Sequence, residues 1–136
     1  MKALIDTNVI LDLFLNRQPF VTEATAIWQA NAIGKITAYV SAVTLTTVFY
    51  VARKAGDLHS ARQVVKDILS SLQIGAVDSG VLQNAEALPI SDFEDAVQIA
   101  SAQAALLDCI ITRNANDFKA SPVPIYEPSA FLALIK

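Results

Sequence analysis

The sequence predicts an α/β fold, a three-layer α/β/α sandwich around a central, mainly parallel sheet. Short runs of branched apolar residues alternate along the chain with longer segments in which apolar residues recur every three or four positions. Neighbouring parallel strands need crossover connections of about a dozen residues or more, and the helical segments supply that length. At 136 residues, the chain is predicted to form a single domain, 1–136, around one hydrophobic core.

The first half of the chain contains two predicted strands and three predicted helices. Pro19 and Gly34 fit the start and the end of the second helix, because proline is favoured in the first turn of a helix and glycine just beyond its last turn. The predicted elements are a strand at 2–5, a helix around Val9 to Phe14, a helix from about Phe20 to Gly34, a strand at 36–40 and a helix at 42–55.

The second half continues the alternation. Gly56 and Asp57 are predicted to end one helix and cap the next, and Pro89 to close a short helix. The predicted elements are a helix from 58 to about 72, a strand at 74–77, a helix at 79–88, a helix from 92 to about 106, a strand at 109–112, a short last strand among the prolines at 122, 124 and 128, and a helix at 129–135.

Composition excludes several function classes. The stretch 36–52 carries no charge, but a spanning helix needs about 20 predominantly apolar residues and five hydroxyl side chains interrupt this one. Asp6 interrupts the apolar N-terminal run, so a signal peptide is not expected and the predicted location is the cytoplasm, without a membrane partner. Cys109 and His59 are each the only residue of their kind, which argues against disulfides and zinc.

Charge argues against nucleic-acid binding through bulk attraction. The net charge is −3 and the pI is near 4.9, so any contact with phosphates has to be local. The candidates for such a contact are Arg53, Lys54, Arg62, Lys66, Arg113 and Lys119, and most of these are expected to be solubilising surface charges instead.

Polar and acidic residues gather at predicted strand and helix ends. Asp6 follows the first strand and Asn114 follows the strand at 109–112. Asp92 and Asp95 open a late helix three positions apart, so they share one face of it. Sites in open parallel sheets form outside the carboxyl ends of the strands. We therefore expect Asp6 and Asp95 to converge at one edge of the sheet, with Asn114 or Asp117 nearby.

Each acidic residue also has a simpler structural interpretation. Asp6 could cap the first helix, Ser91 and Glu94 could form a capping box, and 114–117 could be a turn. Each is the better explanation of its own segment. Their joint placement at the ends of elements favours a common site.

Three segments resemble the PIN-domain family, which includes the toxin ribonucleases of VapBC toxin–antitoxin pairs. They span most of the chain, in the order in which that family has them. The segments are LIDTNVIL at 4–11, DFEDAVQ at 92–98 and ITRNANDF at 111–118.

The resemblance implies a metal-dependent endoribonuclease that hydrolyses RNA phosphodiester bonds with Mg²⁺ or Mn²⁺, as the toxin of a toxin–antitoxin pair. Carboxylates suit this chemistry because they hold hard cations that neutralise charge on the reacting phosphate. The implied catalytic residues are Asp6, Asp95 and Asp117; the metal ligands are Asp6, Asp95, Asn114 and Asp117; the supporting residues are Asn8, Thr47, Asp92 and Thr112.

One acid of the family pattern is absent. The family has a glutamate in the helix after the second strand, and Thr47, or with less support Thr46, stands there. Because a neutral hydroxyl binds divalent cations less well than a carboxylate, we expect a weakened metal site, with Asp92 or Asp117 compensating. The alternative is a catalytically degenerate PIN-like module that binds protein or RNA.

The resemblance also implies partners: an RNA substrate, a second copy in a homodimer, and an antitoxin protein. Large apolar residues support an apolar contact surface, because the helices carry more of them than a one-sided helix needs: Phe14, Phe20, Trp28, Phe49 and Tyr50. Two other classes with a strand-end aspartate fit less well. A haloacid-dehalogenase-type phosphatase needs an acid where Asn8 stands, and a receiver domain needs an opening acidic pair that is missing.

Overall fold

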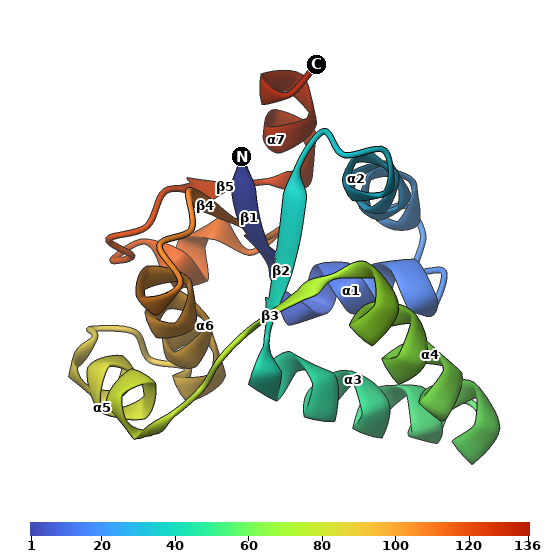
Figure 1. Cartoon of the computed structure of the whole chain (residues 1–136), viewed down its shortest axis with the longest axis horizontal. Helices are drawn as coiled ribbons and strands as arrows, with labels where there is room; N and C mark the ends of the chain where they lie inside the picture. The colour runs from blue at the N-terminus through green and yellow to red at the C-terminus, as the bar shows by residue number, and fades with distance from the viewer.

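The computed structural model describes all residues, 1–136, and shows a five-stranded, wholly parallel sheet in the order β3-β2-β1-β4-β5 with helices on both faces (Figure 1). The predicted α/β sandwich is confirmed. The strands are β1 (Lys2–Ile5), β2 (Thr37–Ser41), β3 (Gln73–Gly75), β4 (Cys109–Ile111) and β5 (Ile125–Tyr126). The helices are α1 (Thr7–Phe14), α2 (Val21–Ala32), α3 (Ala42–Ala55), α4 (Leu58–Ser71), α5 (Ser79–Ala87), α6 (Phe93–Ala104), α7 (Pro128–Leu134) and the 3₁₀ helix η1 (Ala115–Phe118).

The predicted elements are all present, with most ends shifted by one or two residues. The main difference is the third strand, which was predicted at 74–77 and is observed at Gln73–Gly75. It stops there because β2 ends at Ser41, which pairs with Gly75, so the next residues have no neighbouring strand to bond. The segment 114–117, for which a turn was the simpler alternative, lies largely in the 3₁₀ helix η1.

Alternation of side chains along the strands divides the core between the two faces of the sheet. Ala3 and Ile5 of β1 pack in the cluster that contains Ile10 of α1 and Ile27 of α2. Leu4, which points the other way, packs in a second cluster with residues of α6, β4 and η1. Figure 1 shows the same division, with α1 to α4 on one side of the sheet and α5 and α6 on the other.

The register of β1 and β4 brings two polar residues to the same edge of the sheet. Ile5 pairs with Ile111, so Asp6 and Thr112 follow directly at adjacent carboxyl ends. The backbone N–H of Asp6 still donates to the carbonyl of Ile111, across 2.9 Å. This bond extends the pairing between the two strands by one residue. None of the helices has the length and apolar character that crossing a bilayer requires.

Candidate active site

Asp6 is a buried carboxylate held by two neutral donors. Only 2% of the residue is exposed. Gln98 donates from Nε2 to Oδ1 across 2.9 Å, and Thr112 donates from Oγ1 to Oδ2 across 2.8 Å. Asp6 occupies the N-cap position of α1 but makes no side-chain capping bond. Helix capping therefore does not account for its carboxylate, which is oriented by contacts from α6 and β4 instead.

Burial raises the pKa of Asp6, and its hydrogen bonds with Gln98 and Thr112 oppose that rise. Desolvation disfavours the charged form of a carboxylate, whereas donors stabilise it. No cation lies within ion-pair distance of Asp6, since both salt bridges in the chain involve Asp12. A negative charge at this position would thus be favoured by a bound cation.

Gln98 was missed as a site residue. It is fully buried in α6, and besides donating to Asp6 it accepts from the backbone N–H of Thr7 across 3.2 Å. One side chain thereby links α6, the end of β1 and the start of α1. The sequence carried a signal for it, because Gln98 is an uncharged polar residue in an otherwise apolar run from Ala96 to Ala100.

Glu94 was also missed, because it was interpreted as part of a capping box with Ser91. That alternative is not observed: the N-cap of α6 is Asp92, whose Oδ1 accepts from the backbone N–H of Asp95 across 3.0 Å. The carboxylate of Glu94 accepts instead from the Thr47 hydroxyl at 3.0 Å and from the Thr7 hydroxyl at 2.9 Å. Two threonines from different helices therefore orient it.

A cleft of about 380 Å³ opens at this edge of the sheet. It contains all but one of the residues expected at the site, and the exception, Thr112, lies buried beside Asp6 and bonds to it. Thr7, Arg17 and Glu94 are additions that the sequence did not single out. The lining residues are Asp6, Thr7, Asn8, Leu11, Arg17, Thr47, Val51, Asp92, Glu94, Asp95, Asn114 and Asp117.

The cleft concentrates negative charge. The pKa of Asp95 is raised to about 7, first by burial and then by repulsion from Asp92, Asp6, Asp117 and Glu94. Like charges close together cannot all ionise without cost, and a cation among them removes that cost.

The donors of the cleft fit a hard divalent cation. Carboxylate oxygens, with the amide oxygen of Asn114, are ligand types that Mg²⁺ and Mn²⁺ prefer. No group of three or more His, Cys, Asp or Glu side chains is already arranged to hold a metal ion. That observation is compatible with Mg²⁺, which keeps several waters and commonly takes only one or two protein carboxylates.

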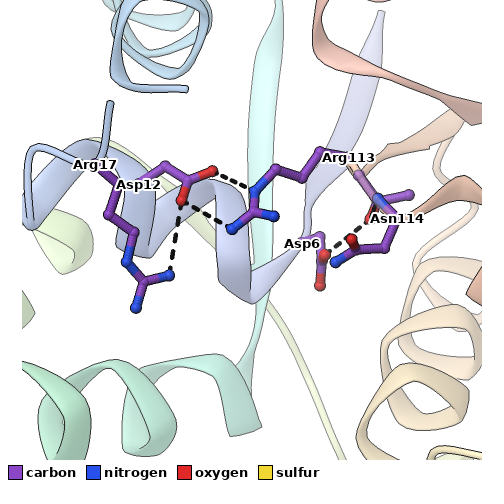
Figure 2. A network of polar contacts seen from close by, with 6 residues as sticks. Asp6, Asp12, Arg17, Arg113 and Asn114 are labelled. Carbon is purple, nitrogen blue, oxygen red and sulfur yellow. Dashed lines mark hydrogen bonds and ion pairs between the residues drawn. The ribbon is translucent and has the colours of Figure 1, made fainter. Parts of the chain in front are cut away.

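Next to the cleft, Asp12 of α1 is buried and bound by two arginines (Figure 2). Arg113 donates from Nε to Oδ2 across 2.8 Å and from Nη2 to Oδ1 across 3.2 Å. Its guanidinium also lies 4.2 Å from the ring centroid of Phe20. Arg113, one of the candidates for a phosphate contact, instead bonds both oxygens of Asp12. It ties the segment after β4 to α1.

Arg17 is the only basic residue that lines the cleft. Its Nη1 lies 3.7 Å from Oδ1 of Asp12, an ion pair without a hydrogen bond. Arg113 already bonds both oxygens of Asp12. The donors of Arg17 are therefore available to another anion.

The fold and the acidic cleft together define a class. A family model described as a PIN domain matches residues 2–116, and the chain belongs to that family. The fold is similar to that of a toxin–antitoxin complex from Klebsiella pneumoniae, with a TM-score of 0.69 and 28% identity over 93% of this chain and 97% of that chain.

Two more distant structures share the fold. One is VapBC2 from Rickettsia felis bound to a promoter DNA fragment, with TM-score 0.70 and 16% identity over 93% of this chain and 98% of that one. The other is VapC20 from Mycobacterium tuberculosis, a toxin that cleaves the sarcin–ricin loop, with TM-score 0.70 and 12% identity over 87% of this chain and 94% of that one. Among curated protein sequences, none matches this chain.

Proposed function

We propose that this protein is a metal-dependent endoribonuclease and the toxin of a toxin–antitoxin pair, acting on RNA in the cytoplasm. The observation that carries the proposal is the cleft at the carboxyl ends of β1 and β4, where Asp6 faces the acids of α6 and η1. Membership of the PIN domain family supports it, as does the similarity to VapC20, which is described as a toxin that cleaves the sarcin–ricin loop.

Asp6 and Asp95 would hold Mg²⁺ or Mn²⁺, with Asn114 and Asp117 completing the site. When bound, the cation supplies charge neutralisation at the scissile phosphate. Gln98 and Thr112 hold the Asp6 carboxylate in one orientation. Asn8 and Asp92 line the same cleft and support it, Asp92 by fixing the first turn of α6.

Arg17 would position the RNA. It is the single cation of a cleft lined by five acids, and its guanidinium is not hydrogen-bonded to Asp12. A guanidinium can donate two parallel hydrogen bonds to a phosphate. Such a local contact is what an acidic protein with net charge −3 needs in order to bind a polyanion.

An antitoxin and a second copy of the chain are the proposed partners. The similar structures from K. pneumoniae and R. felis are toxin–antitoxin assemblies. Phe14 and Trp28 pack edge to face against each other and are both partly buried. Tyr50 and Leu69, which are 61% and 55% exposed on α3 and α4, are better candidates. A monomer at all concentrations in sedimentation would contradict the dimer.

A non-cleaving binding module is the second candidate. The absence of three carboxylates already arranged around a metal position favours it, as does Thr47 where the family has an acid. This candidate predicts RNA or antitoxin binding that is independent of Mg²⁺ and Mn²⁺.

Cleavage of a defined RNA set with and without Mn²⁺ separates the two candidates. We expect cleavage only with the metal, and a loss of more than about 100-fold in Asp6→Asn and Asp95→Asn, exceeding the cost of losing an outer-shell partner. Asp67→Asn is a matched control, since Asp67 lies on α4 outside the cleft and accepts one bond from Gln63. Equal cleavage by wild type and Asp6→Asn would reject the nuclease assignment.

A further inference from the structure

We propose that Glu94 supplies the metal-binding carboxylate that the chain lacks at position 47. The proposal rests on the proposed metal-dependent function and names a further ligand for that site. Asp92 or Asp117 was expected to compensate for the absent glutamate, but neither forms a hydrogen bond with Thr47. Glu94 does form one, at 3.0 Å.

The contacts of Glu94 place its carboxylate beside position 47. The Thr47 side chain belongs to α3, on which the family carries its acid, and it ends at Oε1 of Glu94. Thr7 holds the other oxygen, Oε2, and is itself bonded to Thr44 of α3 at 2.9 Å. The carboxylate thus arrives from α6 and is fixed against α3 by short hydroxyl side chains.

The charge of Glu94 lacks a cationic partner. Both of its oxygens are held by neutral hydroxyls, and neither salt bridge of the chain includes it. The residue is half-buried and lines the same cleft as Asp6 and Asp95. A partly desolvated carboxylate that repels its neighbours is costly unless something positive binds there.

A purely structural role explains less. An acid in the first turn of a helix interacts favourably with the helix dipole, by about 0.3–1 kcal/mol. That role needs no specific side-chain direction. It does not account for two threonines from α1 and α3 that turn the carboxylate of Glu94 into the same cleft as Asp6 and Asp95.

Direct Mn²⁺ binding by calorimetry tests the proposal without relying on activity. We expect Glu94→Gln to weaken Mn²⁺ binding by about 10-fold or more. Glutamine keeps the size of the side chain, and threonine hydroxyls can donate or accept, so the fold is expected to persist and can be checked by thermal melting. Glu86→Gln is the matched control, because Glu86 is exposed on α5 outside the cleft.

Moving the carboxylate provides the second arm. In Thr47→Glu/Glu94→Gln the acid returns to α3, and we expect most of the Mn²⁺ affinity to return with it. A double variant no better than Glu94→Gln would contradict the equivalence of the two positions. The Asp6→Asn variant distinguishes failure of the Glu94 proposal from failure of the metal site itself. If Asp6→Asn no longer binds Mn²⁺ but Glu94→Gln still binds it with wild-type affinity, the role of Glu94 is rejected and the metal site stands. Wild type that binds no Mn²⁺ rejects both.

Discussion

Gln98 of α6 donates from Nε2 to Oδ1 of Asp6 across 2.9 Å, and this bond joins the second helical layer to the end of the central strand. Its Oε1 simultaneously accepts from the backbone of Thr7. Gln98 is thus a positioning residue: it does not line the cleft, but it fixes the acid that does.

Gln98→Leu is predicted to weaken both stability and activity. The substitution leaves one Asp6 oxygen and the N–H of Thr7 without their partner, which costs about 1–3 kcal/mol of unfolding free energy for a buried polar group. Misorientation of Asp6 should lower Mn²⁺ affinity about 10–100-fold. Urea unfolding and calorimetry measure the two effects. Gln103→Leu, an exposed change on the same helix, serves as control. Equal behaviour of both variants would contradict the role of Gln98.

Metal-free protein is predicted to lose stability as pH rises. Asp95 has a folded-state pKa of about 7, raised from 3.8, so folding favours its protonated form. Its stabilising contribution is complete below about pH 4 and is lost as pH rises through about 7. In the presence of a chelator, the melting temperature should therefore fall less between pH 5 and pH 8 for Asp95→Asn than for wild type. The same fall in both proteins would show that Asp95 does not titrate in this range.

The Asp12–Arg113 pair is predicted to be structural. Arg113→Met leaves a buried carboxylate facing only the more distant Arg17. The cost should be about 2–3 kcal/mol, below the 3–5 kcal/mol of a fully buried pair because Arg113 is partly exposed. Asp12→Leu/Arg113→Met should recover part of the loss, since no charge is then stranded. Chemical denaturation measures the free energy of unfolding of each variant. If the double variant loses as much as the two single variants together, Asp12 and Arg113 are not energetically coupled.

Arg17→Gln is predicted to lower the affinity for RNA and to make that affinity less dependent on salt concentration. Loss of one phosphate contact on a single strand lowers the slope of log K against log salt by about 0.7. The measurement uses the Asp6→Asn background to suppress cleavage, with Arg53→Gln, an exposed change on α3, as control. An unchanged slope in the Arg17→Gln variant would mean that Arg17 does not contact the phosphate backbone of the RNA.

The fold could be predicted because its signals are local. Periodicity and proline or glycine punctuation located every strand and α-helix, and placement at strand ends and at a helix start predicted that Asp6, Asp95 and Asn114 lie at one edge. The two site residues that the sequence analysis did not find are oriented by long-range contacts. Gln98 and Glu94 meet partners 47 to 92 positions away, just after β1, on α1 and on α3, and no local pattern encodes those distances.

The alternative of a capping box at Ser91 and Glu94 is absent from the structure for a related reason. Ser91 and Glu94 have the correct spacing, but Asp92 is an equally good cap one residue later. In the structure Asp92 caps α6, and Glu94 bonds to the threonines of α1 and α3 instead of to its own helix end. Competition of that kind is resolved only in the folded chain.

Anomalous diffraction from crystals soaked in Mn²⁺ tests the central claim most directly, because it locates the cation independently of any substrate. We predict a Mn²⁺ peak in the cleft bounded by Asp6 and Asp95, absent from Asp6→Asn crystals prepared in the same way. A saturating soak that gives no peak in this cleft, or a peak that persists in Asp6→Asn, would contradict the assignment of these acids to a metal-dependent nuclease site.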